Sequence, residues 1–369
     1  MVFRESPANG TGWAWQITLP SLSHIGGSLK DANSRVAILF NGALCSFFLC
    51  APCIQNAKAQ FMAFYSICGE VGNYLTFPIY AIDSLCAFRD AIRMPSAMSD
   101  ILFARRSNNR ILVSSRPDHV FQGWKGENER WLFVSPHDDD VVIGAGLHFI
   151  AGIESGVPTH AVVSTIGAGY CRLEHKDTIA NIRRDECCKS FEILGLPREN
   201  LHFLDYWATD ILQNLGRRFT DNPASATAIA GADGFQNSFT WLLRQIRPSR
   251  VFLPSQTDIH PAHKAVHEEF IISVFHAQGK IWPELGEPIA KFPRLYEYAT
   301  YSDYIEPPTH QVKTSADLFE RKLAGIAAYE SQEQIESIVV NIRSLGPREY
   351  IREMEFKLFN PQQYDALFE

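Results

Sequence analysis

The sequence lacks a surplus of positive charge. It has 34 Lys and Arg against 41 Asp and Glu, which gives a net charge of −7 and a pI of about 6.0. Domains that bind nucleic acid or anionic lipid usually concentrate basic residues on one face. We therefore expect no nucleic-acid partner and no association with a membrane. An internal repeat is also missing, which argues against a solenoid or a propeller.

The sequence also lacks a disulfide framework. Eight cysteines in 369 residues are too few and too unevenly spread for one. Cys50 and Cys53 form a single CxxC pair, and no second pair follows at zinc-finger spacing. The cysteines therefore predict neither a secreted disulfide scaffold nor a structural zinc site.

What is present is an ordinary globular composition, 46% hydrophobic and 20% charged, with an unusual first part. Residues 36–54, VAILFNGALCSFFLCAPCI, form a nearly uncharged run. We expect an N-terminal extension over 1–110 and a catalytic domain over 111–369. The run makes a membrane anchor or a signal segment one alternative, and translation starting at Met94 or Met98 is another. Without an anchor, the expected location is the cytoplasm.

From residue 111 onward, short apolar stretches alternate with helical patterns. Strands are predicted at 130–135, 159–165, 201–206 and 250–255, and helices at 142–156, 178–195 and 235–247, with Thr178 as an N-cap. This alternation predicts an α/β fold, a Rossmann-like, mostly parallel sheet with helices on both faces. Loops at the carboxyl edge of such a sheet carry the functional residues.

Two of these loops are rich in metal-binding side chains. The first loop follows strand 130–135 and holds His137, Asp138, Asp139 and Asp140. The second loop follows strand 250–255 and holds Asp258, His260, His263 and His267. Consecutive carboxylates repel one another unless a cation lies among them. Two imidazoles and a carboxylate leave the fourth position of zinc open for water, which is the pattern of a catalytic site.

The two loops together resemble the LmbE-like (PIG-L) family of zinc-dependent N-deacetylases. PHDDDV (136–141) resembles the family motif A-H-P-D-D-E, and HPAH (260–263) resembles H-P-D-H. The resemblance covers about residues 130–356. It implies that zinc is bound by His137, Asp140 and His263. It further implies that Asp139 is the general base, and that His260 stabilises the oxyanion or protonates the leaving amine.

Three weaker stretches follow in the family's order: RRDECCKSFEILG (183–195), FLDY (203–206) and YESQ (329–332). The first makes Arg183 a candidate for holding substrate, with an intrahelical pair to Asp185 or Glu186 as the rival interpretation. Trp207 is a candidate for stacking on a sugar ring. Asp258 either contacts substrate, orients a histidine or caps the following helix, and His267 is expected to pack.

The sequence departs from the family pattern at Asp138, Val141, Ala262 and Tyr329, and none of these removes a zinc ligand. The resemblance implies a hydrolase that removes an N-acetyl group from an amino sugar, such as an N-acetylglucosaminyl conjugate. The alternatives are a catalytically weakened sugar-binding protein of the same fold and a magnesium-dependent phosphotransferase. The particular sugar conjugate and the oligomeric state stay open.

Overall fold

The computed structural model describes residues 100–107, 110–167 and 175–368 with their side chains, except that only the backbone of Lys176 is described. Within residues 1–96 it describes only the backbone of six strands. The chain divides into two units, 1–96 and 97–369. In the first unit the strands form three antiparallel pairs: β1 (Val2–Ser6) with β2 (Ala14–Thr18), β3 (Asn33–Phe40) with β4 (Ala43–Cys50), and β5 (Phe64–Cys68) with β6 (Tyr74–Pro78). The side chains of the apolar run 36–54 lie outside the described residues.

The second unit is built on one nine-stranded sheet. Five neighbouring strands are parallel: β9 (Trp131–Ser135), β10 (Thr159–Ile166), β11 (Leu201–Trp207), β14 (Arg250–Pro254) and β15 (Arg294–Tyr298). Four antiparallel strands extend it: β7 (Ile101–Ser107), β8 (Arg110–Ser114), β16 (His310–Thr314) and β17 (Arg348–Met354). The order is β11-β10-β9-β14-β15-β17-β16-β7-β8. The predicted α/β fold class is confirmed, with an antiparallel half that the strand–helix alternation did not indicate.

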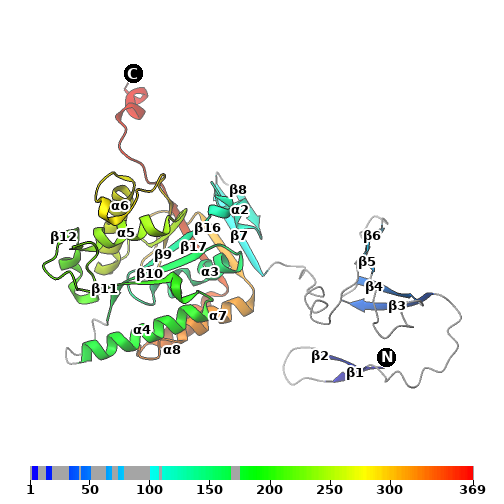
Figure 1. Ribbon diagram of the computed structural model, residues 1–369. Coiled ribbons are helices and arrows are strands. Elements are labelled where there is room, and N and C mark those ends of the chain that lie inside the picture. The colour runs from blue at the N-terminus through cyan, green and yellow to red at the C-terminus, as the bar shows by residue number, and fades with distance from the viewer. Residues whose placement is uncertain are drawn as a thin grey trace. The chain divides into compact units, whose positions relative to one another are not determined.

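Helices cover both faces of this sheet (Figure 1). One face carries α3 (Asp140–Glu154), α4 (Lys176–Ile193), α7 (Ala316–Ala327) and α8 (Ile335–Leu345), and the other carries α5 (Phe235–Ile246) and α6 (Pro261–Gln278). Each layer has its own apolar core, and the alternating side chains of the strands supply both. In the described part of the chain, no helix is both long and apolar enough to cross a membrane.

Short elements complete the second unit. They are α2 (Pro117–Val120), the strand pair β12 (Arg218–Phe219) and β13 (Ala232–Asp233), and the 3-10 turns η3 (Gly126–Asn128), η5 (Arg198–Asn200), η6 (Ala208–Asn214), η7 (Pro283–Leu285) and η8 (Pro361–Leu367).

Two details of the sequence-based prediction differ from the structure. The second unit begins at Ala97, so residues 101–107, which we expected outside the domain, belong to its sheet because β7 pairs with β16. Helix α4 begins at Lys176 with His175 at the N-cap position, so Thr178 lies inside the helix instead of capping it.

Candidate metal centre

The two motif-bearing loops meet where the strand order reverses. The chain leaves β9 for β10 on one side, and it leaves β14 for β15 on the other, so β9 and β14 are neighbours with diverging connections. In an open α/β sheet this point forms a crevice at the carboxyl edge, where ligands bind. His137 and Asp140 follow β9, and His260 and His263 follow β14.

The turn between β9 and α3 is held by bonds to the sheet. The backbone N–H and the hydroxyl of Thr165 both donate to the carbonyl of Pro136, at 3.0 and 2.8 Å. The hydroxyl of Ser135 accepts the backbone N–H of Val141 at 3.2 Å. Val141, where the family motif has glutamate, is fully buried in the apolar core. These contacts fix where the turn presents its side chains.

Three donor atoms converge in this crevice. Oδ2 of Asp140 lies 3.0 Å from Nδ1 of His137 and 3.1 Å from Nε2 of His263, and the two nitrogens are 3.3 Å apart. Tetrahedral zinc with bonds of about 2.0–2.1 Å separates its ligand atoms by about 3.3–3.4 Å. In addition, Oδ1 of Asp140 is buried without a hydrogen-bond partner. The three predicted ligands are therefore brought together, and their spacing and chemistry fit a zinc ion.

Asp140 is completely buried and lies between the imidazoles of His137 and His263. Burial alone favours its neutral form, but the imidazoles of His263 and His137 outweigh burial and hold the pKa of Asp140 well below its usual range. The backbone N–H of His137 also donates to Oδ2 at 2.7 Å. The carboxylate is thus kept anionic, as a metal ligand must be.

Asp258 orients the imidazole of His263 by binding the ring nitrogen that does not face the crevice. Its Oδ2 lies 3.1 Å from Nδ1 of His263, and both side chains are fully buried. A carboxylate accepts, so Nδ1 carries the proton and Nε2 presents its lone pair to the crevice. Oδ1 accepts the backbone N–H of His260 at 2.9 Å. Of the roles considered for Asp258, the structure favours orienting a histidine, because a fully buried carboxylate does not face a substrate.

His260 stands at the same crevice with a different tautomer. It occupies the N-cap position of α6, where its Nδ1 accepts the backbone N–H of Ala262 at 3.2 Å. A neutral imidazole that accepts at Nδ1 carries its proton on Nε2. Burial and the neighbouring His137 and His263 lower the pKa of His260, which favours this neutral form. One ring nitrogen from each of His137, His260 and His263 lies within 4.8 Å of the others, so these three histidines form a group that could hold a metal ion, with His260 beside the His137–Asp140–His263 set.

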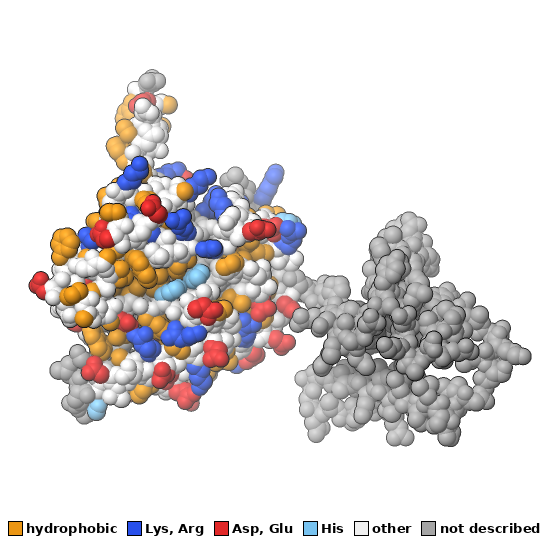
Figure 2. All heavy atoms as spheres, in the orientation of Figure 1, with side chains coloured by type: hydrophobic (Ala, Val, Ile, Leu, Met, Phe, Trp, Pro, Cys, Tyr) orange, Lys and Arg blue, Asp and Glu red, His pale blue; other side chains and the backbone are white. Residues whose placement is uncertain are grey.

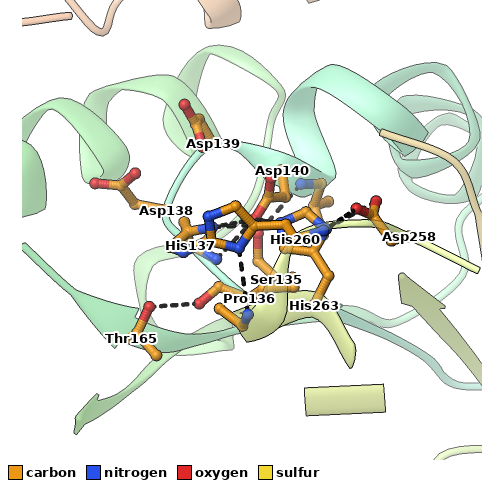
Figure 3. Close-up of polar contacts among 12 residues, drawn as sticks. Ser135, Pro136, His137, Asp138, Asp139, Asp140, Thr165, Asp258, His260 and His263 are labelled. Atoms are coloured by element: carbon orange, nitrogen blue, oxygen red, sulfur yellow. Dashed lines mark hydrogen bonds and ion pairs between the residues drawn. The ribbon is translucent and has the colours of Figure 1, made fainter. Parts of the chain in front are cut away.

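Asp138 and Asp139 point away from the three histidines (Figure 3). Arg183 reaches both: its Nε donates to Oδ2 of Asp138 at 2.8 Å, its Nη2 bonds Oδ1 of Asp138, and the same Nη2 lies 3.2 Å from Oδ2 of Asp139. Arg183 is nearly buried and its Nη1 donates to Gln332. The structure therefore commits Arg183 to the carboxylates of the turn, neither to an intrahelical pair nor to an open substrate pocket.

The structure gives Trp207 and His267 neighbours other than the three donor residues. Trp207 ends β11 and its ring covers Gly167, where a Cβ would lie 2.7 Å from the ring. Nδ1 of His267 lies 2.8 Å from the carbonyl oxygen of Pro254, and the side chain is 5% exposed.

Sequence reasoning missed Tyr301, whose ring lies 5.9 Å from that of His260 and 5.2 Å from that of His263. It is 60% exposed. Figure 2 shows histidine side chains at the surface with hydrophobic side chains on either side. An aromatic residue shortly after β15 was the one available sequence signal.

The residues that form the candidate metal centre lie within a match to a known protein family. Residues 132–274 match the family described as PIG-L, GlcNAc-PI de-N-acetylase, and the matched range includes every candidate ligand. This part of the chain carries the match to the PIG-L family. The predicted LmbE-like (PIG-L) resemblance is confirmed, and with it the assignment to a family of deacetylases.

Solved structures similar to this chain include these three. A conserved protein from Thermus thermophilus is 22% identical, covering 63% of this chain and 97% of its own, with a TM-score of 0.47. The N,N'-diacetylchitobiose deacetylase of Pyrococcus horikoshii is 26% identical, with coverage of 61% and 84% and a TM-score of 0.46. A 4-carboxy-2-hydroxymuconate hydratase from Pseudomonas putida is 18% identical, with coverage of 63% and 98% and a TM-score of 0.46. At these TM-scores the likenesses do not bear on the reaction. No match was found among curated proteins.

Proposed function

We propose that this chain is a zinc-dependent hydrolase that removes the N-acetyl group of an amino sugar, as in an N-acetylglucosaminyl conjugate. The observation that carries the proposal is the convergence of His137 Nδ1, Asp140 Oδ2 and His263 Nε2 at 3.0 to 3.3 Å. Nitrogen ligands with one carboxylate suit zinc better than magnesium, which prefers oxygen.

The roles of the surrounding residues follow from their hydrogen bonds. Zinc held there would supply Lewis acidity, which lowers the pKa of a bound water to about 7 and polarises an amide carbonyl. His260 donates its Nε2–H to the oxyanion that develops at that carbonyl. The proton is on Nε2 because Nδ1 accepts the backbone N–H of Ala262.

Asp139 is the residue that we assign to take the proton of the attacking water. Asp140 belongs to the donor set, and both oxygens of Asp138 are bound by Arg183. Asp139 keeps Oδ1 outside its contact with Arg183 and is 7% exposed. It is therefore the one carboxylate of the 138–140 run with an oxygen outside these pairings. It points away from the histidines in the structure, so our assignment requires its side chain to turn towards the bound water, and it would then return the proton to the departing amine.

Metal content and acetate release test the proposal together. The full chain, purified without chelator, should hold about one zinc, and His263→Ala should lose it while the exposed control His119→Ala retains it. Acetate should be released from N-acetylglucosaminyl compounds by the native chain, and Asp139→Asn should keep zinc but lose release. Absence of zinc from the native chain would contradict the proposal.

The two alternatives give different results in the same assay. A sugar-binding protein of this fold would hold zinc and bind the sugar without releasing acetate. A magnesium-dependent phosphotransferase would act on a phosphate ester and be indifferent to His263→Ala. The ion pair between Asp138 and Arg183 argues against the phosphotransferase, because it occupies the carboxylate that would serve as nucleophile.

A further inference from the structure

Two departures from the family motifs meet in space. Asp138 stands where the first motif has proline, and Tyr329 stands where the later motif has histidine. Although 191 residues separate them in sequence, the hydroxyl of Tyr329 donates to the backbone carbonyl of Asp138 at 2.5 Å. Tyr329 is fully buried and Asp138 nearly so. The two unusual residues are thus direct partners.

Arg183 completes the contact. It binds the carboxylate of Asp138 through two nitrogens, and its guanidinium carbon lies 4.8 Å from the centre of the Tyr329 ring. Its Nη1 donates to Oε1 of Gln332 at 3.1 Å. Glu186, one helical turn further along α4, accepts the backbone N–H and the hydroxyl of Ser331, each at 2.7 Å. Helix α4 and residues 329–332 therefore hold each other and Asp138.

A proline at position 138 would stiffen the turn through its fixed φ angle. Aspartate gives no such restraint, so the backbone at this position needs another source of rigidity. Here the Asp138 carbonyl is fixed by Tyr329 and the Asp138 carboxylate is fixed by Arg183. Residue 138 lies between His137, a candidate ligand, and Asp139, the assigned base, and Asp140 follows at the start of α3.

We propose that Asp138, Tyr329 and Arg183 form a positioning lock that replaces the missing proline and fixes the 137–140 turn in the geometry that binds metal. The effect of the lock on catalysis rests on the proposed function, whereas its effect on the geometry of the 137–140 turn does not. Its residues do not touch the substrate; they act through His137 and Asp140 as ligands and Asp139 as base. Partners that orient metal ligands typically change metal affinity by about 10–100-fold when removed.

Binding of Co²⁺ tests whether these three residues hold the metal-binding geometry, and it does not depend on enzymatic activity. Tyr329→Phe removes one hydroxyl from the full chain and keeps the buried ring. We expect it to weaken Co²⁺ binding about tenfold, to change the visible absorption of bound Co²⁺, and to speed amide hydrogen exchange across 137–140. Tyr364→Phe, which removes a hydroxyl from the exposed C-terminal segment, should leave all three unchanged.

A second variant keeps the test decisive if Tyr329→Phe does not fold. Asp138→Asn preserves the shape of the side chain and weakens only its pairing with Arg183, and it should give the same three changes. Folded variants with native Co²⁺ affinity, spectrum and exchange would overturn the lock. If the native chain binds Co²⁺ but releases no acetate, the deacetylase proposal fails while these measurements still decide the lock. In an active enzyme, both variants should lower kcat with KM nearly unchanged.

Discussion

The carboxylate of Asp258 lies 3.1 Å from Nδ1 of His263, and neither side chain is exposed. Its second oxygen accepts the backbone N–H of His260, so one carboxylate serves both histidines of the HPAH stretch. Asparagine has a single oxygen, and in Asp258→Asn one of the two N–H donors therefore loses its acceptor. We expect about 10–100-fold weaker zinc binding, measured by competition with a chromophoric chelator.

Asp118→Asn is a suitable control for that measurement, because Asp118 pairs with the exposed Arg116 away from the crevice. Zinc affinity that is unchanged in Asp258→Asn would show that the tautomer of His263 is set by other contacts.

Tyr301 offers a ring beside His260 and is 60% exposed. A ring so placed can pack against the apolar face of a substrate that sits on the metal. Tyr301→Ala should raise KM about tenfold with kcat and zinc content retained, whereas Tyr301→Phe should behave as the native chain. A large loss of kcat in Tyr301→Phe would instead assign a chemical role to the hydroxyl. Steady-state acetate release separates the two.

The lowered pKa of buried Glu349 leads us to expect that the chain loses stability in acid. Burial opposes its ionisation, but Lys322 and His148 outweigh burial and lower the pKa of Glu349 to about 2 from an ordinary value of 4.5. A lowered pKa in the folded chain gives stability that is present above the unfolded pKa and is lost as the pH falls towards the folded one. Between pH 6 and pH 3 this group should cost about 2 kcal/mol.

Urea unfolding of the native chain and of Glu349→Gln at the two pH values tests this. The variant should be less stable at pH 6, because Lys322 is left buried without its partner, and its stability should fall less on acidification. Glu355→Gln, at an exposed position, is the control. An equal acid loss in Glu349→Gln would assign the pH dependence to other groups.

Arg244 forms hydrogen bonds to backbone carbonyls at the C-terminus of helix α6 and in the segment that follows it. The five N–H groups of its guanidinium lie within hydrogen-bond distance of six backbone carbonyls, those of His276, Ala277, Gly279, Ile281, Trp282 and Gly286. Arg244→Met leaves these acceptors without their buried donor, and we expect it to lower the free energy of unfolding by about 3 kcal/mol. Lys280→Met, at an exposed neighbouring position, should change it by less than about 0.5 kcal/mol. Thermal unfolding of both variants distinguishes a buried anchor from a dispensable surface charge.

The strand–helix alternation was readable from the sequence because it depends on local periodicity. The predicted strand at 130–135 and helix at 235–247 agree closely with β9 (131–135) and α5 (235–246). Placing the two histidine-bearing loops at one edge followed from this pattern, since the carboxyl ends of parallel strands meet there. The antiparallel half escaped prediction because β7 pairs with β16, which lies some 200 residues further along the chain.

The sequence by itself placed His137, Asp140 and His263 in two loops at one edge of the sheet, and the resemblance to the family motifs made them candidate metal ligands. Only the tertiary structure decided the partners of those residues. Arg183 had acidic neighbours on its own helix, yet it binds Asp138 because α4 packs its buried face against the turn. Asp258 likewise binds His263 because both are enclosed together. Such pairings depend on which faces of separate elements are packed against each other, and no local pattern encodes that.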